Sequence, residues 1–273
     1  MVIFGTIGLF VRNIPLPSTE IALYRAFIAA AVLFIYRCIF KKRGKKISKK
    51  EAVLLFISGA IMGINWILLF QAYRYTTVSI ATLSYYFAPV LVMAVSPFLF
   101  NEKRTKRQTF CFFMATIGLV LVIGIQKMEQ TNTEMIGIAF GLGAAILYAI
   151  IILLNKKIQK VEGVDRTFYQ FLAAGMVLLP YVLSTGTLGI TRLEERGLVN
   201  LMILGIIHTG LAYCLYFPSL KELEGQKVAI LSYVDPLTAI LVSIFFLSEP
   251  IGFWQIVGGI MILGFTLLSE NKE

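Results

Sequence analysis

Long apolar stretches and short polar gaps alternate along the whole chain, and few folds accommodate such a pattern. A helix needs about 20 apolar residues to cross a hydrocarbon core about 30 Å thick. Ten such helices would use about 200 of the 273 residues and leave only short connections. The pattern therefore predicts an all-α integral membrane protein with ten transmembrane helices. The ten stretches cover residues 1–12, 20–39, 52–73, 77–100, 107–126, 135–155, 167–184, 198–218, 227–248 and 252–269.

The composition agrees with a lipid environment. Hydrophobic residues make up 58% of the chain and charged residues 15%, whereas soluble domains average about 45–50% and about 25%. This excludes soluble enzymes, secreted modules and nucleic-acid-binding proteins. The three cysteines form no CxxC pair and show no metal-ligand spacing, so we interpret them as small buried hydrophobes and expect no metal and no cofactor.

The net charge of +10 comes from basic residues in the gaps between the apolar stretches. With the amino terminus placed inside, 19 of the 25 basic residues fall in gaps on one side and five on the other. Cytoplasmic loops of membrane proteins carry such an excess, so we expect a multi-pass protein of the cell (plasma) membrane with both termini cytoplasmic. The basic run over 41–50 is either this topology signal or a site for anionic lipid headgroups.

Arg25 is the basic residue that falls inside an apolar stretch, near the outer end of the second one. A long cationic side chain there can extend to the membrane interface while its stem stays in lipid. We therefore interpret Arg25 as an interfacial anchor, with an ion pair to Glu20 as the alternative.

The chain contains an internal duplication. The segment Tyr86–Pro89 and Glu102 recur as Tyr233–Pro236 and Glu249, 147 residues later without a gap. A match at a fixed offset over about half the chain indicates two copies of one structural unit. An earlier segment, Tyr24–Phe27, corresponds to Tyr169–Leu172 at an offset of 145.

The duplication predicts a first repeat over residues 1–126 and a second over 135–269, each with five helices. Because five is odd, the second repeat enters the membrane upside down relative to the first, as two inverted five-helix repeats. Inverted repeats are typical of secondary transporters, whose sites lie near the midplane between the halves. By comparison with the second repeat, roughly ten residues of the first helix look missing, so we expect that helix to be truncated.

Two sets of motifs resemble the EamA domain of the drug/metabolite transporter superfamily. The first set is Gly63–Trp66, Phe70–Tyr75, and Tyr86–Pro89 to Glu102; the second is Ala212–Phe217, Leu231–Pro236 to Glu249, and Gly258-Gly259. The resemblance implies a ten-helix carrier, often an exporter of amino acids or other small metabolites. It also implies a central cavity lined mainly by helices 1, 3, 4, 6, 8 and 9. The short first helix and an extra Pro97, opposite Ile244, depart from the pattern.

Pro89 and Pro236 fall inside the fourth and ninth stretches. Each removes a backbone donor and displaces the carbonyl four residues earlier, at Tyr85 and Ser232. Loosened carbonyls persist at membrane depth where protein or a watery cavity satisfies them. We interpret the pair either as kinks that open a midplane cavity and act as hinges, or as fixed bends required by packing.

Asp235 is the acid that lies deepest in an apolar stretch, and Ala88 stands at the equivalent place in the first repeat. Ionisation of a carboxyl group there costs at least about 2.5–3.5 kcal/mol, which favours the protonated form. Asp235 is therefore a candidate to pair with a cationic group of a substrate or to carry a coupling proton. The alternative is a structural acid held by backbone groups freed at Pro236.

Further candidates for the cavity are polar and aromatic residues in several stretches. His208, the single histidine, is a candidate proton relay or a hydrogen-bonded packing residue. The aromatic residues, with one amide, provide rings and hydroxyls for an apolar or aromatic solute, or else form core packing and interfacial belts. The predicted set is Asn65, Trp66, Tyr85, Tyr86, Tyr148, His208, Tyr213 and Asp235.

These observations favour a secondary-active transporter that moves a small organic metabolite by alternating access. The solute gradient or a proton gradient would supply the energy. No GxxxxGK[ST] motif is present, so ATP is not expected to drive it directly. The alternatives are a channel or lipid scramblase and an integral-membrane enzyme acting on lipid, for which a single histidine and one deep acid are a poor set of groups. Expected partners are the small-molecule substrate and the bilayer; whether the protein is a monomer or a homodimer stays open.

Overall fold

The computed structural model describes residues 1–40, 47–100, 105–123, 132–158, 160–161, 163–184, 188–216 and 231–270. Every regular element within these ranges is a helix, which confirms the predicted all-helical class. Most of the basic run over 41–50 and the acidic Glu102 lie outside the described residues. The helices are α1 (Val2–Gly5), α2 (Ile7–Arg12), α3 (Ser18–Phe40), α4 (Lys49–Tyr75), α5 (Val78–Tyr85), α6 (Ala88–Phe100), α7 (Lys106–Ile123), α8 (Asn132–Lys157), α9 (Gly163–Ser184), η1 (Gly189–Arg192), α10 (Glu195–Gly205), η2 (Ile206–Leu211), α13 (Val234–Phe245) and α14 (Phe253–Glu270).

Several helices are long and apolar enough to cross a membrane. Among the described residues, six helical segments meet this condition by length and hydropathy, and three shorter apolar ones accompany them. Large apolar side chains also point away from the protein, with Phe98 80% and Phe245 74% exposed. Lipid is the solvent that suits such a surface. The chain is therefore a multi-pass membrane protein. The six segments are Ser18–Phe40, Lys49–Tyr75, Val78–Phe100, Thr133–Lys157, Gly163–Ser184 and Glu195–Tyr216; the shorter ones are Val2–Arg12, Val234–Phe245 and Phe253–Ser269.

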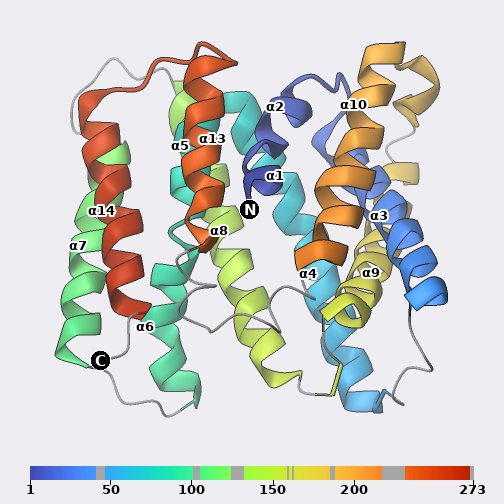
Figure 1. Cartoon of the computed structure of the whole chain (residues 1–273), viewed down its shortest axis with the longest axis horizontal. Coiled ribbons are helices and arrows are strands. Elements are labelled where there is room, and N and C mark those ends of the chain that lie inside the picture. Colours follow the sequence, from blue (N-terminus) through green and yellow to red (C-terminus); the bar gives the residue numbers. More distant parts are fainter. Residues whose placement is uncertain are drawn as a thin grey trace.

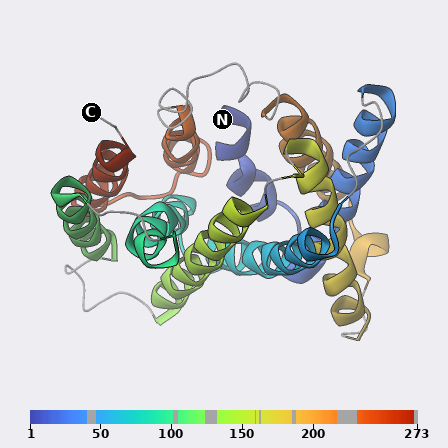
Figure 2. The same cartoon turned by 90° about the horizontal axis from the view of Figure 1, so that it is seen from below.

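Helices from the two halves of the chain pack against each other. The last helix, α14, packs along α7, and α9 packs against α3 and α4. In Figures 1 and 2, α7 and α14 stand at one side of the bundle and α3 and α9 at the other, with α4 and α8 between them. The helices α7 and α14 approach each other closely at glycines, because a Cβ atom on Gly118 would lie 2.8 Å from the carbonyl oxygen of Gly258. Small residues of this kind let membrane helices approach closely.

The fourth predicted span is interrupted in the middle. The helix α5 ends at Tyr85, and α6 begins at Ala88, directly before Pro89. Pro89 has no N–H to donate to the carbonyl of Tyr85, which explains why the helix is broken there. The ninth span has a similar break, since a turn at Tyr233 precedes α13 and Pro236 lies in its first turn. The structure thus places an interruption at both predicted proline sites.

A π-helical turn, η2, follows α10 in the eighth span. It covers His208 and Thr209, whose side chains reach the carbonyl oxygens of Ile203 and Leu204, five residues earlier. Such turns widen a helix locally and are frequent at functional sites. Here the turn directs the Thr209 hydroxyl toward α3.

Candidate functional site

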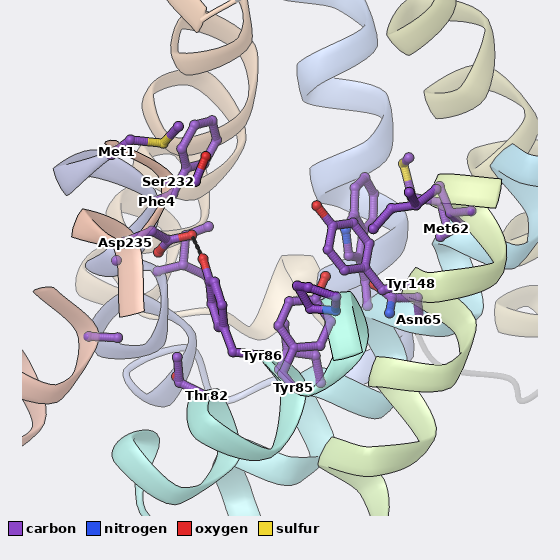
Figure 3. Close-up of a pocket in the computed structure, with 18 of the residues that line it drawn as sticks. Met1, Phe4, Met62, Asn65, Thr82, Tyr85, Tyr86, Tyr148, Ser232 and Asp235 are labelled. Carbon is purple, nitrogen blue, oxygen red and sulfur yellow. Dashed lines mark hydrogen bonds between the residues drawn. The ribbon is translucent and has the colours of Figure 1, made fainter. Parts of the chain in front are cut away.

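A cavity of about 330 Å³ lies between helices of both halves. Its walls come from the first-half helices α1 to α6 and from α8, α13 and the helical turns around Tyr213 and Tyr216 in the second half. Figure 3 shows Asp235, Tyr86, Tyr85, Tyr148 and Asn65 arranged around it. The helices that the family resemblance implies as lining are represented, and α3 joins them through Arg25.

The cavity collects most of the side chains that the sequence singled out. Seven of the eight predicted cavity residues line it, and His208 does not. Of the two prolines, Pro89 lines the cavity, and Pro236 is buried next to Asp235 in α13. Whether these residues bind a substrate stays a prediction. The seven are Asn65, Trp66, Tyr85, Tyr86, Tyr148, Tyr213 and Asp235.

Asp235 is held by a residue of the other half. The hydroxyl of Tyr86, at the end of α5, donates a hydrogen bond to Oδ2 of Asp235 (Figure 3). Among the described residues the second carboxylate oxygen, Oδ1, has no hydrogen-bond partner. Asp235 thus joins the two halves of the chain through one hydrogen-bonded oxygen.

Arg25 does not extend to the membrane interface, so its interpretation as an interfacial anchor was wrong. The residue is only 4% exposed, and it lines the cavity. Its Nε donates a 2.8 Å hydrogen bond to the hydroxyl of Thr209, and its guanidinium lies 4.4 Å from the ring centroid of Trp66. Glu20 instead accepts a hydrogen bond from the backbone N–H of Gly189 at 2.7 Å. Contacts with aromatic rings and with Thr209 of the π turn hold Arg25 in the interior. The sequence signal for a polar interior position was the match of Arg25 to Gln170 in the second repeat.

Aromatic rings form much of the cavity wall. Tyr85 and Tyr148 stack with centroids 5.1 Å apart, and Phe4 contacts Tyr213 at 5.3 Å. Asn65 serves the fold as well, because its side-chain amide donates a 2.6 Å hydrogen bond to the carbonyl of Ala144 in α8. The wall therefore offers π faces and hydroxyl groups rather than a row of charges.

His208 has a different location from the one predicted. Its Nε2 lies 2.8 Å from the hydroxyl of Thr6, and its ring contacts that of Phe10 at 4.6 Å. The residue is 3% exposed and packs between the first helices and η2. This arrangement matches the packing alternative rather than a relay at the cavity.

A polar cluster of Arg12, Glu249 and their partners joins the end of α2 to the segment after α13 and to the ends of α4 and α5. Arg12 forms an ion pair with Glu249 and donates hydrogen bonds to the carbonyls of Tyr73 and Thr76, at 2.8 and 2.6 Å. Glu249, which is 8% exposed, also accepts a 2.8 Å hydrogen bond from the backbone N–H of Val78. It thereby caps the N-terminus of α5 in the other half of the chain.

In comparisons with known proteins, one family model matches both halves of the chain. The model of the EamA-like transporter family matches residues 1–124 and 135–270. The "Uncharacterized transporter YxxF" of Bacillus subtilis is 30% identical over 276 residues, covering 100% of this chain and 88% of that protein. An "Uncharacterized transporter" of Archaeoglobus fulgidus is 29% identical, covering 99% and 93%. A solved crystal structure with a TM-score of 0.68 and 16% identity covers 98% of this chain and 94% of its own, and it shares the fold.

Proposed function

The chain belongs to the EamA-like transporter family, and on that premise we propose that it is a secondary-active exporter of small organic metabolites such as amino acids. Membrane transport is what its relatives are named for. The finer proposal concerns how it transports: ten spanning helices form two inverted five-helix repeats, over 1–126 and 135–269, with both termini cytoplasmic. The same premise favours transport over lipid chemistry.

The observation that carries the proposal is a cavity shared by the two halves. It holds about 330 Å³, which suits a metabolite of modest size. Tyr86 from the first half and Asp235 from the second are hydrogen-bonded in its wall. A movement of one half against the other therefore changes the shape of the cavity, as alternating access requires.

The cavity and the closed cluster around Arg12 and Glu249 support one conformation of such a cycle. The lining includes Ile152, near the last turn of α8, and Ser232, two residues before α13. Ser232 precedes α13 and Glu249 follows it, so the length of this helix separates the two residues. With the proposed orientation, the cavity extends toward the cytoplasm and the cluster closes the outer side.

Counterflow in proteoliposomes tests the proposal. Vesicles with the full chain are loaded with a pool of amino acids, nucleosides and organic cations, and uptake of labelled members is measured at two pH values. We expect saturable, trans-stimulated exchange of one chemical class, and none in vesicles without protein. Flux that rises linearly without saturation would instead indicate a channel, and flipping of a fluorescent lipid in the same vesicles would indicate a scramblase.

A further inference from the structure

The guanidinium of Arg25 is a buried cation whose charge is not neutralised by the described residues. The residue is 4% exposed and lies in the wall of the cavity. Among the described parts of the chain, no carboxylate lies within ion-pair distance of it, and its hydrogen bond is the one from Nε to Thr209. A charge inside a membrane protein costs several kcal/mol unless it is compensated.

The neighbours of Arg25 orient the cation without satisfying it. Trp66 and Phe70 present their rings at 4.4 and 5.5 Å from the guanidinium carbon. Ring faces stabilise a cation but accept none of its in-plane N–H donors. With Nε held by Thr209, the two terminal nitrogens keep donors to offer to the cavity. A planar pair of donors matches the two oxygens of a carboxylate.

The internal duplication provides a comparison within the same molecule. Gln170 stands where the first repeat has Arg25. Its amide nitrogen donates to Ser58 and to Asn155, both at 2.7 Å, and it is not among the residues that line the cavity. The position is thus a polar packing site in the second repeat. In the first repeat it carries a positive charge that faces the cavity.

We propose that Arg25 binds the carboxylate of the transported solute, so that the carrier selects small carboxylate-bearing molecules with an apolar or aromatic body. This inference rests on the proposed function of the cavity and narrows its substrate class. Trp66 and Tyr213 provide the apolar surface next to the anion site. Organic cations and neutral nucleosides leave the guanidinium uncompensated and are excluded.

Matched solutes test the inference with the full chain in proteoliposomes. Phenylalanine, 3-phenylpropionate and 2-phenylethylamine share one ring and differ in their charged groups; leucine, 4-methylpentanoate and isopentylamine form an aliphatic series. We expect counterflow of the carboxylate-bearing members and none of the two amines. Arg25→Gln should raise the half-saturating concentration of the carboxylates about tenfold or more, because a charge-assisted bidentate contact is lost.

Two further variants separate binding from folding. Arg25→Lys keeps the charge but not the planar pair of donors, so we expect an intermediate rise in half-saturating concentration. Arg37→Gln is the matched control, since Arg37 also lies 4.4 Å from a ring, that of Phe168, and pairs with Asp165 at 2.9 Å outside the cavity. It should leave the half-saturating concentration unchanged. Thermal unfolding and size exclusion check that each variant is folded. If Arg25→Gln does not fold, the half-saturating concentration of Arg25→Lys tests the role of Arg25.

The outcomes distinguish the two proposals. Carboxylate exchange that is equally saturable in folded Arg25→Gln overturns the role of Arg25. Exchange of amines, nucleosides or other solutes without a carboxylate, in the absence of carboxylate exchange, also overturns it, and the carrier function stands. If the unmodified protein exchanges no solute of any class, the proposed function itself fails.

Discussion

At the scale of single residues, Asp235 is an ionisable group that forms a contact between the two halves. One of its oxygens accepts a hydrogen bond from Tyr86 across the two halves, and the other has no hydrogen-bond partner among the described residues. A proton or an ammonium group bound at the second oxygen would neutralise the carboxylate that accepts the hydrogen bond from Tyr86. We therefore propose that Asp235 couples the occupancy of the cavity to the contact between the two halves.

Asp235→Asn removes the titrating group while keeping an oxygen that accepts from Tyr86. If Asp235 carries a coupling proton, exchange that varies between about pH 5 and about pH 8 in the unmodified protein should become independent of pH in the variant. Counterflow rates across that pH range measure this. Tyr86→Phe, which keeps the carboxyl group, should retain the pH dependence. Unchanged transport in folded Asp235→Asn would contradict both a proton-coupling and a substrate-binding role.

Sequence reasoning located the cavity residues better than their partners. A deep acid, an amide, a histidine and aromatic residues were visible as eight candidates, and seven of them line one cavity. Arg25 was misplaced because its depth depends on two rings and on the π turn that presents Thr209. His208 was open to two interpretations, since nothing in the local sequence shows that Thr6 lies 2.8 Å from it.

At the scale of elements, the break between α5 and α6 shapes the cavity. It leaves Tyr85 and Tyr86 at the end of one short helix and Pro89 at the start of the next, and all three line the cavity. The sequence predicted an interruption from proline alone. The exact position of the turn, at residues 86 and 87, was not predictable from the proline. It depends on a hydrogen bond from the N–H of Tyr86 to the carbonyl of Thr82, which extends the first helix to its last residue.

Pro89→Ala should therefore slow exchange while the protein stays folded. Alanine restores a donor for the carbonyl of Tyr85 and lets the helix continue through the break, which disfavours the bend. Pro97→Ala is the matched control: Pro97 lies inside the same helix, α6, but not at the cavity. We expect a fall of about tenfold in the counterflow rate for Pro89→Ala and little change for Pro97→Ala. Equal rates in both variants would identify Pro89 as a fixed packing bend.

At the scale of the whole molecule, the duplication predicts that two halves enter the membrane in opposite directions. Hydropathy and repeat spacing identified the all-helical membrane class, because lipid leaves few alternatives. The number of spans is harder to derive, since among the described residues six helical segments meet the length and hydropathy conditions and three further apolar helices are shorter. Helix interruptions weaken the hydropathy signal where a cavity is built.

The orientation follows from the basic gaps and has its own test. A fluorescent protein fused to the carboxyl terminus should fluoresce, because it folds in the cytoplasm, and an alkaline phosphatase fusion at the same place should be inactive. The excess of 19 basic residues against five on the two sides gives this prediction its direction. An active phosphatase at the carboxyl terminus would place that end outside and reverse the sidedness proposed for the cavity.

The cluster of Arg12 and Glu249 lies at the end that we propose to be closed toward the outside. The ion pair of Arg12 with Glu249, and the hydrogen bond from the N–H of Val78 to Glu249, join the start of α5 to the end of α13 across the two halves. Glu249→Gln keeps an acceptor for Val78 and removes the ion pair. It should therefore favour the conformation in which this end is open.

The most direct measurement is the accessibility of one cavity residue from each side of the membrane. Thr82 lines the cavity. Thr82→Cys, in a background with Cys38, Cys111 and Cys214 replaced, is labelled with an impermeant maleimide from either side. We predict faster labelling from the cytoplasmic side, and in Glu249→Gln an outer rate about tenfold higher with a lower cytoplasmic rate, because a shift of about 1.4 kcal/mol moves a two-state equilibrium that far. A variant that raises both rates together would indicate a continuous pore and contradict alternating access.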